Sequence, residues 1–206
     1  MHRLLVPLVL LLPALAAAEA DPRFARLRDQ AEPLSSLNSF LENYIGECGE
    51  AFAPPECSAN AKAFRSKSAG KKFYMIVGEE QASSILSPGP YDPRGEYTVN
   101  IAPLFAAGGY AITHGAPKKV DRNGNPMVMY VQAKGSVPEG WNASRFQRLF
   151  STRGLRVQVV FTPQGVWSLP KKGGGKQHGV KAKVDAIYVT IARTGEPVGL
   201  WLADKK

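Results

Sequence analysis

Apolar residues recur every three or four positions in the part of the chain that follows residue 20. Residues 22–29 place Phe24 and Leu27 three positions apart, which favours a short first helix. The apolar face of the next predicted helix is formed by Leu34, Leu37, Leu41, Tyr44 and Ile45. Pro33 suits the first turn of this helix, and Gly46 can end it.

A third helix is predicted after the double proline at positions 54 and 55. It runs to about Ser66 and turns Ala61 and Phe64 inward.

A fourth helix is predicted further along, between strands. Asn142 or Ser144 can cap it, and its apolar face is formed by Phe146, Leu149 and Phe150. Asn142-Ala143-Ser144 also fits an N-glycosylation sequon, but we favour the capping role.

After Gly70 the apolar pattern changes from a period of 3.6 residues to a period of two. Such alternation, or a compact apolar run, predicts strands at 73–77, 97–101, 110–113, 127–133, 155–161, 166–169, 180–191 and 198–202. Asn123-Gly124 favours a tight hairpin turn. The proline-rich segment 87–95 is predicted to be a stiff connector and not the interior of a strand.

The order of these elements predicts the fold class. Helices come first, the strands follow one another almost directly, and the βαβ alternation of a parallel sheet is missing. We therefore predict an α+β fold, with N-terminal helices followed by a mainly antiparallel sheet and one further helix between strands. Residues 21–206 have the length of a single domain.

The first 20 residues have the pattern of a secretory signal peptide. Arg3 precedes an apolar run over residues 4–15, and cleavage after Ala18 or Ala20 would follow small residues. The run is too short to cross a bilayer, and no later segment is apolar enough to do so. The sequence thus predicts an exported protein, periplasmic or extracellular, whose mature chain has no transmembrane segment.

Two cysteines fit this prediction. Cys48 and Cys57 lie nine positions apart, and an exported chain meets oxidising conditions. We expect a Cys48–Cys57 disulfide that stabilises the fold by about 2 to 3 kcal/mol.

Charge is distributed unevenly along the chain, whose net charge is +9. Residues 118–206 contain 16 Lys and Arg against 5 Asp and Glu, whereas residues 1–117 contain 10 against 12. This asymmetry favours an anionic partner. Because an exported protein does not meet chromosomal nucleic acid, we expect an anionic lipid, an acidic glycan or an acidic protein.

Two basic clusters are candidate binding residues for such a partner. The first surrounds three consecutive glycines and contains Lys171, Lys172, Lys176, His178, Lys181 and Lys183. The second runs from the fourth predicted helix into the next strand and contains Arg145, Arg148, Arg153 and Arg156. A mobile lysine-rich loop can adapt to an anionic surface, and arginines one helical turn apart can hold phosphate or carboxylate groups. A solvated loop and ordinary surface charge are the alternatives.

Catalytic motifs give little support to an enzyme. The chain contains no G-x-S-x-G, P-loop, H-E-x-x-H or dinucleotide-binding pattern. Only His114 and His178 would remain after signal-peptide removal, so neither a metal site nor a cofactor is predicted. His114, at the end of a predicted strand, is a weak catalytic candidate, because its ring would need a carboxylate partner that no spacing identifies.

Two acidic patterns have plain structural interpretations. Glu79 and Glu80 are predicted to form a solvated strand end, since adjacent strand residues point to opposite faces. Asp121 and the asparagines after it resemble the start of a calcium loop, but Pro126 replaces the required glycine and a hairpin turn explains the same residues.

Together these patterns favour an exported, non-enzymatic binding or structural module for an anionic envelope or extracellular partner. The alternative is a metal-independent, hydrolase-like secreted enzyme that uses His114. A third possibility, an assembly partner, would require an exposed apolar patch near Trp201.

Overall fold

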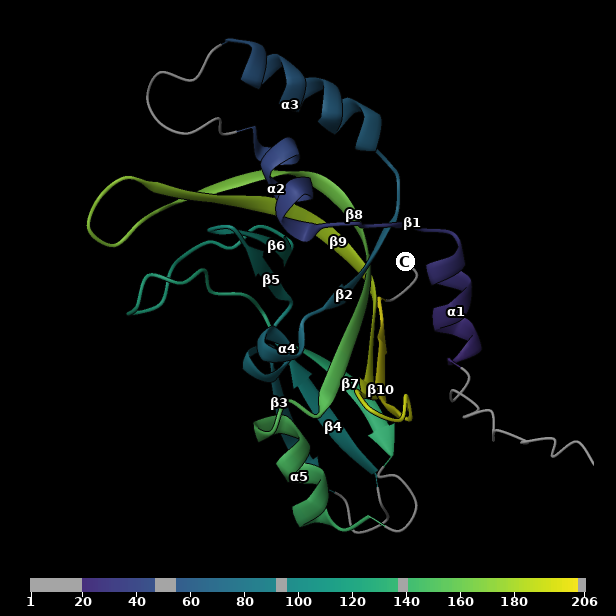
Figure 1. Ribbon diagram of the computed structural model, residues 1–206. Coiled ribbons are helices and arrows are strands. Elements are labelled where there is room, and N and C mark those ends of the chain that lie inside the picture. The colour runs from purple at the N-terminus through teal and green to yellow at the C-terminus, as the bar shows by residue number, and fades with distance from the viewer. Residues whose placement is uncertain (1–19, 47–54, 92–95, 137–140, 204–206) are drawn as a thin grey trace, which may run out of the picture.

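The computed structural model describes residues 20–46, 55–91, 96–136 and 141–203, and its fold is α+β, as predicted (Figure 1). Its helices are α1 (Pro22–Asp29), α2 (Leu37–Ile45), α3 (Pro55–Ser68), α4 (Glu79–Ile85) and α5 (Ala143–Ser151). Its strands are β1 (Glu32–Pro33), β2 (Phe73–Val77), β3 (Leu86–Tyr91), β4 (Glu96–Ile101), β5 (Leu104–Ala107), β6 (Tyr110–His114), β7 (Val131–Ser136), β8 (Leu155–Pro170), β9 (Lys176–Ile191) and β10 (Pro197–Leu202).

The described strands belong to one sheet. Eight of them lie side by side in the order β1-β2-β8-β9-β10-β7-β4-β3, while β6 pairs with β9 and carries β5 on its other side. The β1–β2 and β6–β9 pairs are parallel, and the other pairs are antiparallel. The prediction of a mainly antiparallel sheet that follows N-terminal helices is therefore confirmed.

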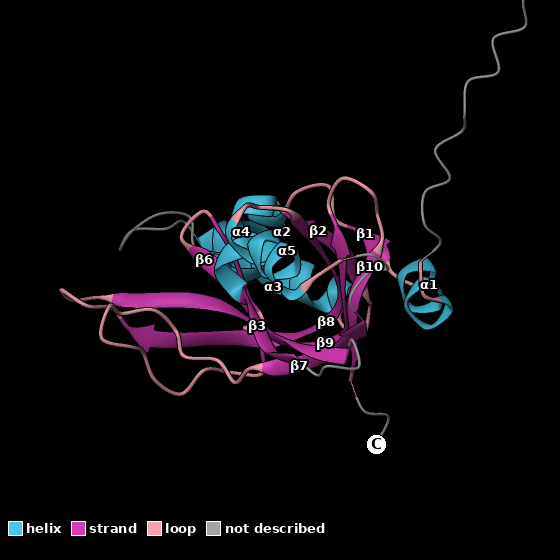
Figure 2. Cartoon of the chain, turned by 90° about the horizontal axis from the view of Figure 1, so that it is seen from below, coloured by secondary structure: helices cyan, strands magenta, loops and turns pink. Residues whose placement is uncertain are grey.

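The β8–β9 hairpin is the centre of the sheet. Each of its strands is 16 residues long, which is enough to pair with β2, β6 and β10. Residues 186–190 of β9 are bordered by β10, whereas residues 179–182 are bordered by β6. Register shifts at 160/161 and 163/165 mark the bend of the hairpin between these two halves. The half that carries the hairpin turn projects away from the rest of the sheet (Figures 1 and 2), and we call residues 162–183 the distal arm.

The main core lies on the face of the sheet that faces α2, α4 and α5, which gather on one side in Figure 2. Alternate residues of the two long strands point into it, as the period of two requires. The strands and helices contribute, among others, Val157, Val159, Ile187, Val189, Leu41, Ile85, Phe146 and Phe150. Removal of these side chains from water is the main favourable contribution to folding.

The opposite face of the sheet is covered by α1. Phe24 is fully buried there, and its ring is stacked on Tyr188 with centroids 4.9 Å apart. Val160 and Ala186 complete this second cluster. The predicted helix 22–29 is present, and the carboxylate of Asp21 caps it by accepting a hydrogen bond from the Arg23 N–H (2.8 Å).

The second predicted helix begins later than its apolar pattern indicated. Pro33 belongs to β1, and the N–H of Leu34 donates to the Tyr74 carbonyl of β2 (2.8 Å). Pro33 and Leu34, which helical periodicity assigned to the helix, thus pair with the backbone of β2 instead. Ser36 caps the observed helix, and Gly46 ends it in the left-handed conformation (φ 77°), as predicted.

The interpretation of Glu79 and Glu80 as a strand end was wrong. Both lie in the first turn of α4, a helix that the sequence analysis missed. Carboxylates favour this position because the N-terminus of a helix carries a partial positive charge. The helix buries Ala82 and Ile85.

Three strand assignments also need correction. The proline-rich segment is partly β3, an edge strand, where a missing proline N–H does no harm to the ladder. β7 begins at Val131 and not at 127, because its partner β4 ends at Ile101, directly opposite Val131. The predicted strands 155–161 and 166–169 are one bent strand, β8.

Candidate functional site

The tip of the distal arm reverses the chain between β8 and β9. Gly173, Gly174 and Gly175 have φ angles of 91°, 106° and 76°, a region that glycine enters without strain. The Lys171 N–H closes the turn by donating to the Gly175 carbonyl (3.1 Å). This turn leaves the lysines at positions 171, 172 and 176 exposed.

A second turn lies beside the tip. The Asp121 carboxylate organises it by accepting hydrogen bonds from the N–H groups of Asn123 (2.8 Å) and Asn125 (2.9 Å). These bonds, above all the one from Asn125, lower the pKa of Asp121. The flanks of the turn pair only through an isolated bridge between Val120 and Pro126, so the predicted turn is present without two flanking strands.

Two hydrogen bonds join these turns. Lys172 Nζ donates to the Arg122 carbonyl (3.3 Å), and Gln177 Nε2 donates to the Gly124 carbonyl (2.8 Å). Gly124 has a φ of 91°, and a side chain at this position would press against Lys172. The contacts bring together segments that are 50 residues apart in the sequence.

The joined turns form what we call the distal basic surface. It contains the exposed side chains of Lys118, Lys119, Arg122, Lys171, Lys172 and Lys176. Within residues 115–130 and 170–177, all of which are described, Asp121 is the sole acidic residue, and its oxygens accept the hydrogen bonds of the turn. The surface therefore carries a strong excess of positive charge.

A small apolar cluster supports the distal basic surface from within the arm. Trp167 and Leu169 of β8 pack with Ala111 of β6, and Val120 of the second turn packs against them. Gly179 lies directly beside the Trp167 ring, where a Cβ would collide with the ring and with the Ala111 carbonyl. The cluster thus fixes the second turn on the arm by close packing.

The remaining basic residues of the first predicted cluster lie along β9, away from the tip. Lys181 is exposed, and His178 is half-buried opposite Ser168. Lys183 Nζ lies 3.3 Å from Asp185 Oδ1. It lines a cleft of about 470 Å³ between α1 and the sheet, together with Arg23, Arg26, Leu27, Lys72, Asp185, Leu202 and Ala203.

The predicted arginine cluster is not one site. Arg145 and Arg153 line the same groove, whereas Arg148 is exposed on α5. Arg156 lies between the buried residues Leu155 and Val157, so it points to the opposite face of the sheet. The groove and the tip are at opposite ends of β8, separated by up to about 50 Å of extended chain.

This groove has a volume of about 580 Å³ and lies between α4, α5 and the β9–β10 turn. The Arg145 guanidinium lies 3.8 Å from the centroid of the Trp141 ring, a cation–π contact. Arg153 Nη2 is 3.4 Å from Glu80 Oε1. The turn adds Arg193, but Glu79 and Glu196 line the groove as well, so its charge is nearly balanced.

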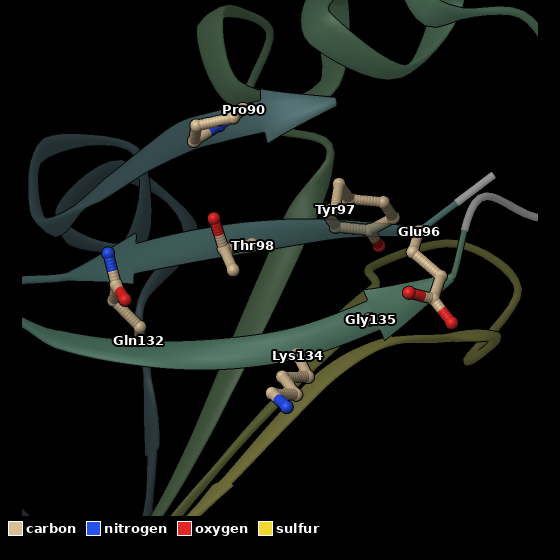
Figure 3. Close-up of a pocket in the computed structure, with 7 residues that line it drawn as sticks. All are labelled: Pro90, Glu96, Tyr97, Thr98, Gln132, Lys134 and Gly135. Carbon is tan, nitrogen blue, oxygen red and sulfur yellow. The ribbon is translucent and has the colours of Figure 1, made fainter. Parts of the chain in front are cut away.

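A hollow of about 590 Å³ lies over β3, β4 and β7 (Figure 3). Figure 3 labels Thr98, Gln132 and Lys134, which lie on the same face of β4 and β7 because Thr98 is directly opposite Lys134. Gln132 Nε2 donates a hydrogen bond to Asn100 Oδ1 (3.1 Å) on the neighbouring strand.

A family match covers the whole chain that carries the distal basic surface. The sequence profile of a family of unknown function, DUF6066, matches residues 1–206. The chain belongs to DUF6066. Neither the curated proteins nor the solved structures contain a match to it.

In this DUF6066 chain, His114 fills a gap between β6 and β10 along the edge of β9. Its Nδ1 accepts a hydrogen bond from the Val184 N–H (3.1 Å), and its ring contacts the edge of Trp201 with centroids 5.5 Å apart. Burial lowers the pKa of His114; the charge of Lys183 acts in the same direction, and that of Asp185 opposes it. The neutral ring thus carries its proton on Nε2. Its Nδ1 serves as acceptor for the Val184 N–H, in the place that a backbone carbonyl takes in a regular strand pair.

Asp185 is the carboxylate that the sequence could not identify for His114. Its negative charge acts to raise the pKa of the His114 ring. Its own oxygens accept a hydrogen bond from Thr162 Oγ1 (2.9 Å) and form an ion pair with Lys183. Trp201 is partly buried against the core, so the described part of the chain offers no exposed patch centred on it.

Other predictions concern metals, membranes and cysteines. Among the described residues of the DUF6066 chain, no three His, Cys, Asp or Glu side chains group where a metal ion could bind. No helix in the same part of the chain is long and apolar enough to cross a membrane. The predicted signal peptide and the predicted Cys48–Cys57 disulfide lie outside the described residues, apart from Ala20 and the backbone of Cys57 in α3.

Sequence reasoning missed half of the distal basic surface. Lys118, Lys119 and Arg122 surround the Asn123-Gly124 turn, and their charges are visible in the sequence. Nothing local predicts that this turn lies against the tip of a hairpin 50 residues away.

Proposed function

We propose that this protein is an exported, non-enzymatic module that binds an anionic partner through the distal basic surface. The observation that carries the proposal is the pair of hydrogen bonds that joins the two turns, Lys172 to Arg122 and Gln177 to Gly124. They join two turns that together carry six exposed cations, and the single carboxylate of these turns is engaged within its own turn.

Lysine chemistry suits a partner with dispersed negative charge. Five of the six cations are lysines, whose ammonium groups act as point charges and do not form the planar two-point contacts of arginine. The glycines at the tip allow these charges to adjust to the partner. Export, which the first 20 residues predict, leaves anionic lipids, acidic glycans and acidic proteins as partner classes.

The arginine groove is not part of the proposed surface. It lies at the far end of β8 from the tip, and its arginines are offset by Glu79 and Glu196.

The experiment compares two variants of equal net charge on immobilised heparin, a polyanion. Lys171→Gln/Lys176→Gln removes two charges from the distal basic surface, and Lys62→Gln/Lys67→Gln removes two exposed charges from α3. We expect the first variant to bind about tenfold or more weakly than the wild type, at roughly 1 kcal/mol per cation, and the second to bind almost as well as the wild type.

Salt dependence is the second readout. Wild-type retention should fall steeply between about 50 and about 200 mM salt, because bound counterions are released on binding. Equal losses in both variants, or retention that does not respond to salt, would contradict the proposal.

A further inference from the structure

Three large side chains next to the distal basic surface are exposed although they are apolar or aromatic. Met127, Met129 and Tyr130 are 44%, 85% and 66% exposed. They belong to the short segment that leads from the second turn to β7. Large exposed apolar side chains that lie together and are rimmed by charge mark an interaction surface.

This apolar group lies beside the charges. The Met127 N–H donates to the Lys119 carbonyl (2.9 Å), which anchors the segment to the distal basic surface. Because an extended chain advances at most about 3.5 Å per residue, Met129 and Tyr130 lie within about 11 Å of that anchor along the chain. The exposed apolar groups therefore lie next to the cationic turn along the chain.

The shape of this region distinguishes between the partner classes. The tip of the distal arm and the turn beside it protrude from the body of the protein (Figures 1 and 2). A protruding surface fits a broad, flat partner better than a single polymer chain, which binds best in a groove. The methionines gain little from a hydrophilic glycan, whereas methionine and tyrosine both enter the boundary between lipid headgroups and acyl chains readily.

We propose that the distal arm docks on the surface of a bilayer that contains anionic phospholipid. Lysines and Arg122 of the distal basic surface contact the headgroups, and Met127, Met129 and Tyr130 insert between them. This inference rests on the proposed function and names its partner class. Acidic glycans and acidic proteins are the alternatives that the experiment separates from it.

The experiment uses the chain from Asp21 onward, which contains all the buried core residues and lacks the apolar leader. Met127→Ser/Met129→Ser/Tyr130→Ser keeps every charge, and Ile76→Ser removes an apolar side chain that is 58% exposed on β2. Binding is measured by co-sedimentation with phosphatidylcholine vesicles, with and without phosphatidylglycerol, and by retention on immobilised heparin.

We expect the wild type and Ile76→Ser to bind vesicles that contain phosphatidylglycerol and not those of phosphatidylcholine alone. The triple variant should lose about tenfold or more in vesicle affinity while its retention on heparin stays within about twofold, because its charges are unchanged. Unchanged melting temperatures would show that the variants are folded.

Other outcomes overturn the inference in different ways. Equal vesicle binding by the triple variant and the wild type would show that the apolar side chains do not insert. A wild type that binds heparin but not vesicles would remove the lipid as partner and leave the proposed function standing. Binding to neither probe would overturn both.

Discussion

At the scale of the residue, His114 shows how a position that suggests catalysis can have a structural role. Its Nδ1 accepts the Val184 N–H at the point where β9 passes from β6 to β10 as its neighbour. Because this nitrogen is engaged, the neutral ring offers only an Nε2 proton and no free base. The contact thus gives His114 a structural role at this junction of strands.

Replacement of His114 should lower stability. In His114→Ala the Val184 N–H loses its acceptor and Trp201 loses an edge contact, so we expect a loss of about 1 to 3 kcal/mol in the free energy of unfolding. In His114→Gln the amide oxygen can accept the same hydrogen bond, so the loss should be smaller. Urea denaturation of the three proteins at neutral pH measures both effects, and an unchanged His114→Ala would contradict the structural role.

The same residue predicts a pH dependence. Burial lowers the pKa of His114 in the folded protein below its value of about 6.5 in the unfolded chain. The unfolded chain therefore binds the proton more readily, and the contribution of His114 to stability is present above about pH 6.5 and is lost as the pH falls through the folded-state pKa. From about pH 7 to about pH 5 the wild type should lose stability relative to His114→Gln. A difference that stays constant over this range would exclude the effect.

At the scale of the element, α5 depends on its first residues. Asn142 Oδ1 accepts a hydrogen bond from the Arg145 N–H (2.8 Å), so Asn142 and not Ser144 is the cap. The helix then directs Phe146 and Phe150 into the main core, where Phe146 packs against Tyr97.

Two variants separate capping from glycosylation at this position. Asn142→Ala and Ser144→Ala both destroy the sequon, but only the first removes the cap. Asn142→Ala should cost about 1 kcal/mol of stability and Ser144→Ala much less, as measured by thermal denaturation. Equal losses in protein from a glycosylating host would favour the sequon instead.

Strand edges explain two of the errors among the predicted elements. Prolines occur in β3 because this strand is at the edge of the sheet, and an edge is a property of the neighbours. Pro33 and Leu34 fit a helical pattern, but they pair with β2, which lies 40 residues later in the chain. In contrast, α1 and β2 have the predicted bounds, because their patterns are strong and local.

At the scale of the whole molecule, the distal arm has a small core of its own. The Ala111, Trp167 and Leu169 cluster is separate from the main core, and it holds the turn that supplies Lys118, Lys119 and Arg122. Packing inside the arm should therefore control the charge arrangement at its tip.

Gly179→Ala tests this connection. The added methyl group would collide with the Trp167 ring, and we expect a stability loss of about 1 to 3 kcal/mol and weaker binding to heparin, although no charge changes. Gly78→Ala, where a methyl group meets open space, is the matched control and should leave heparin binding unchanged, although Gly78 caps α4 and its replacement by alanine lowers stability slightly. If Gly179→Ala were destabilised but still bound heparin as well as the wild type, packing inside the arm would not control the charge arrangement at its tip.

Local patterns and composition are enough to predict the α+β class, the helices before the sheet, the turn at Asn123-Gly124 and the excess of positive charge after residue 117. These features follow from local periodicity and backbone preferences, which involve only neighbouring residues, and from composition, which needs no contact between residues. Tertiary structure alone decided that Lys172 meets Arg122, that the arginines divide between two faces, and that His114 serves Val184. The reason is physical: these relations depend on strand register and on the bend of a long hairpin, which place distant segments together through contacts that no local pattern encodes.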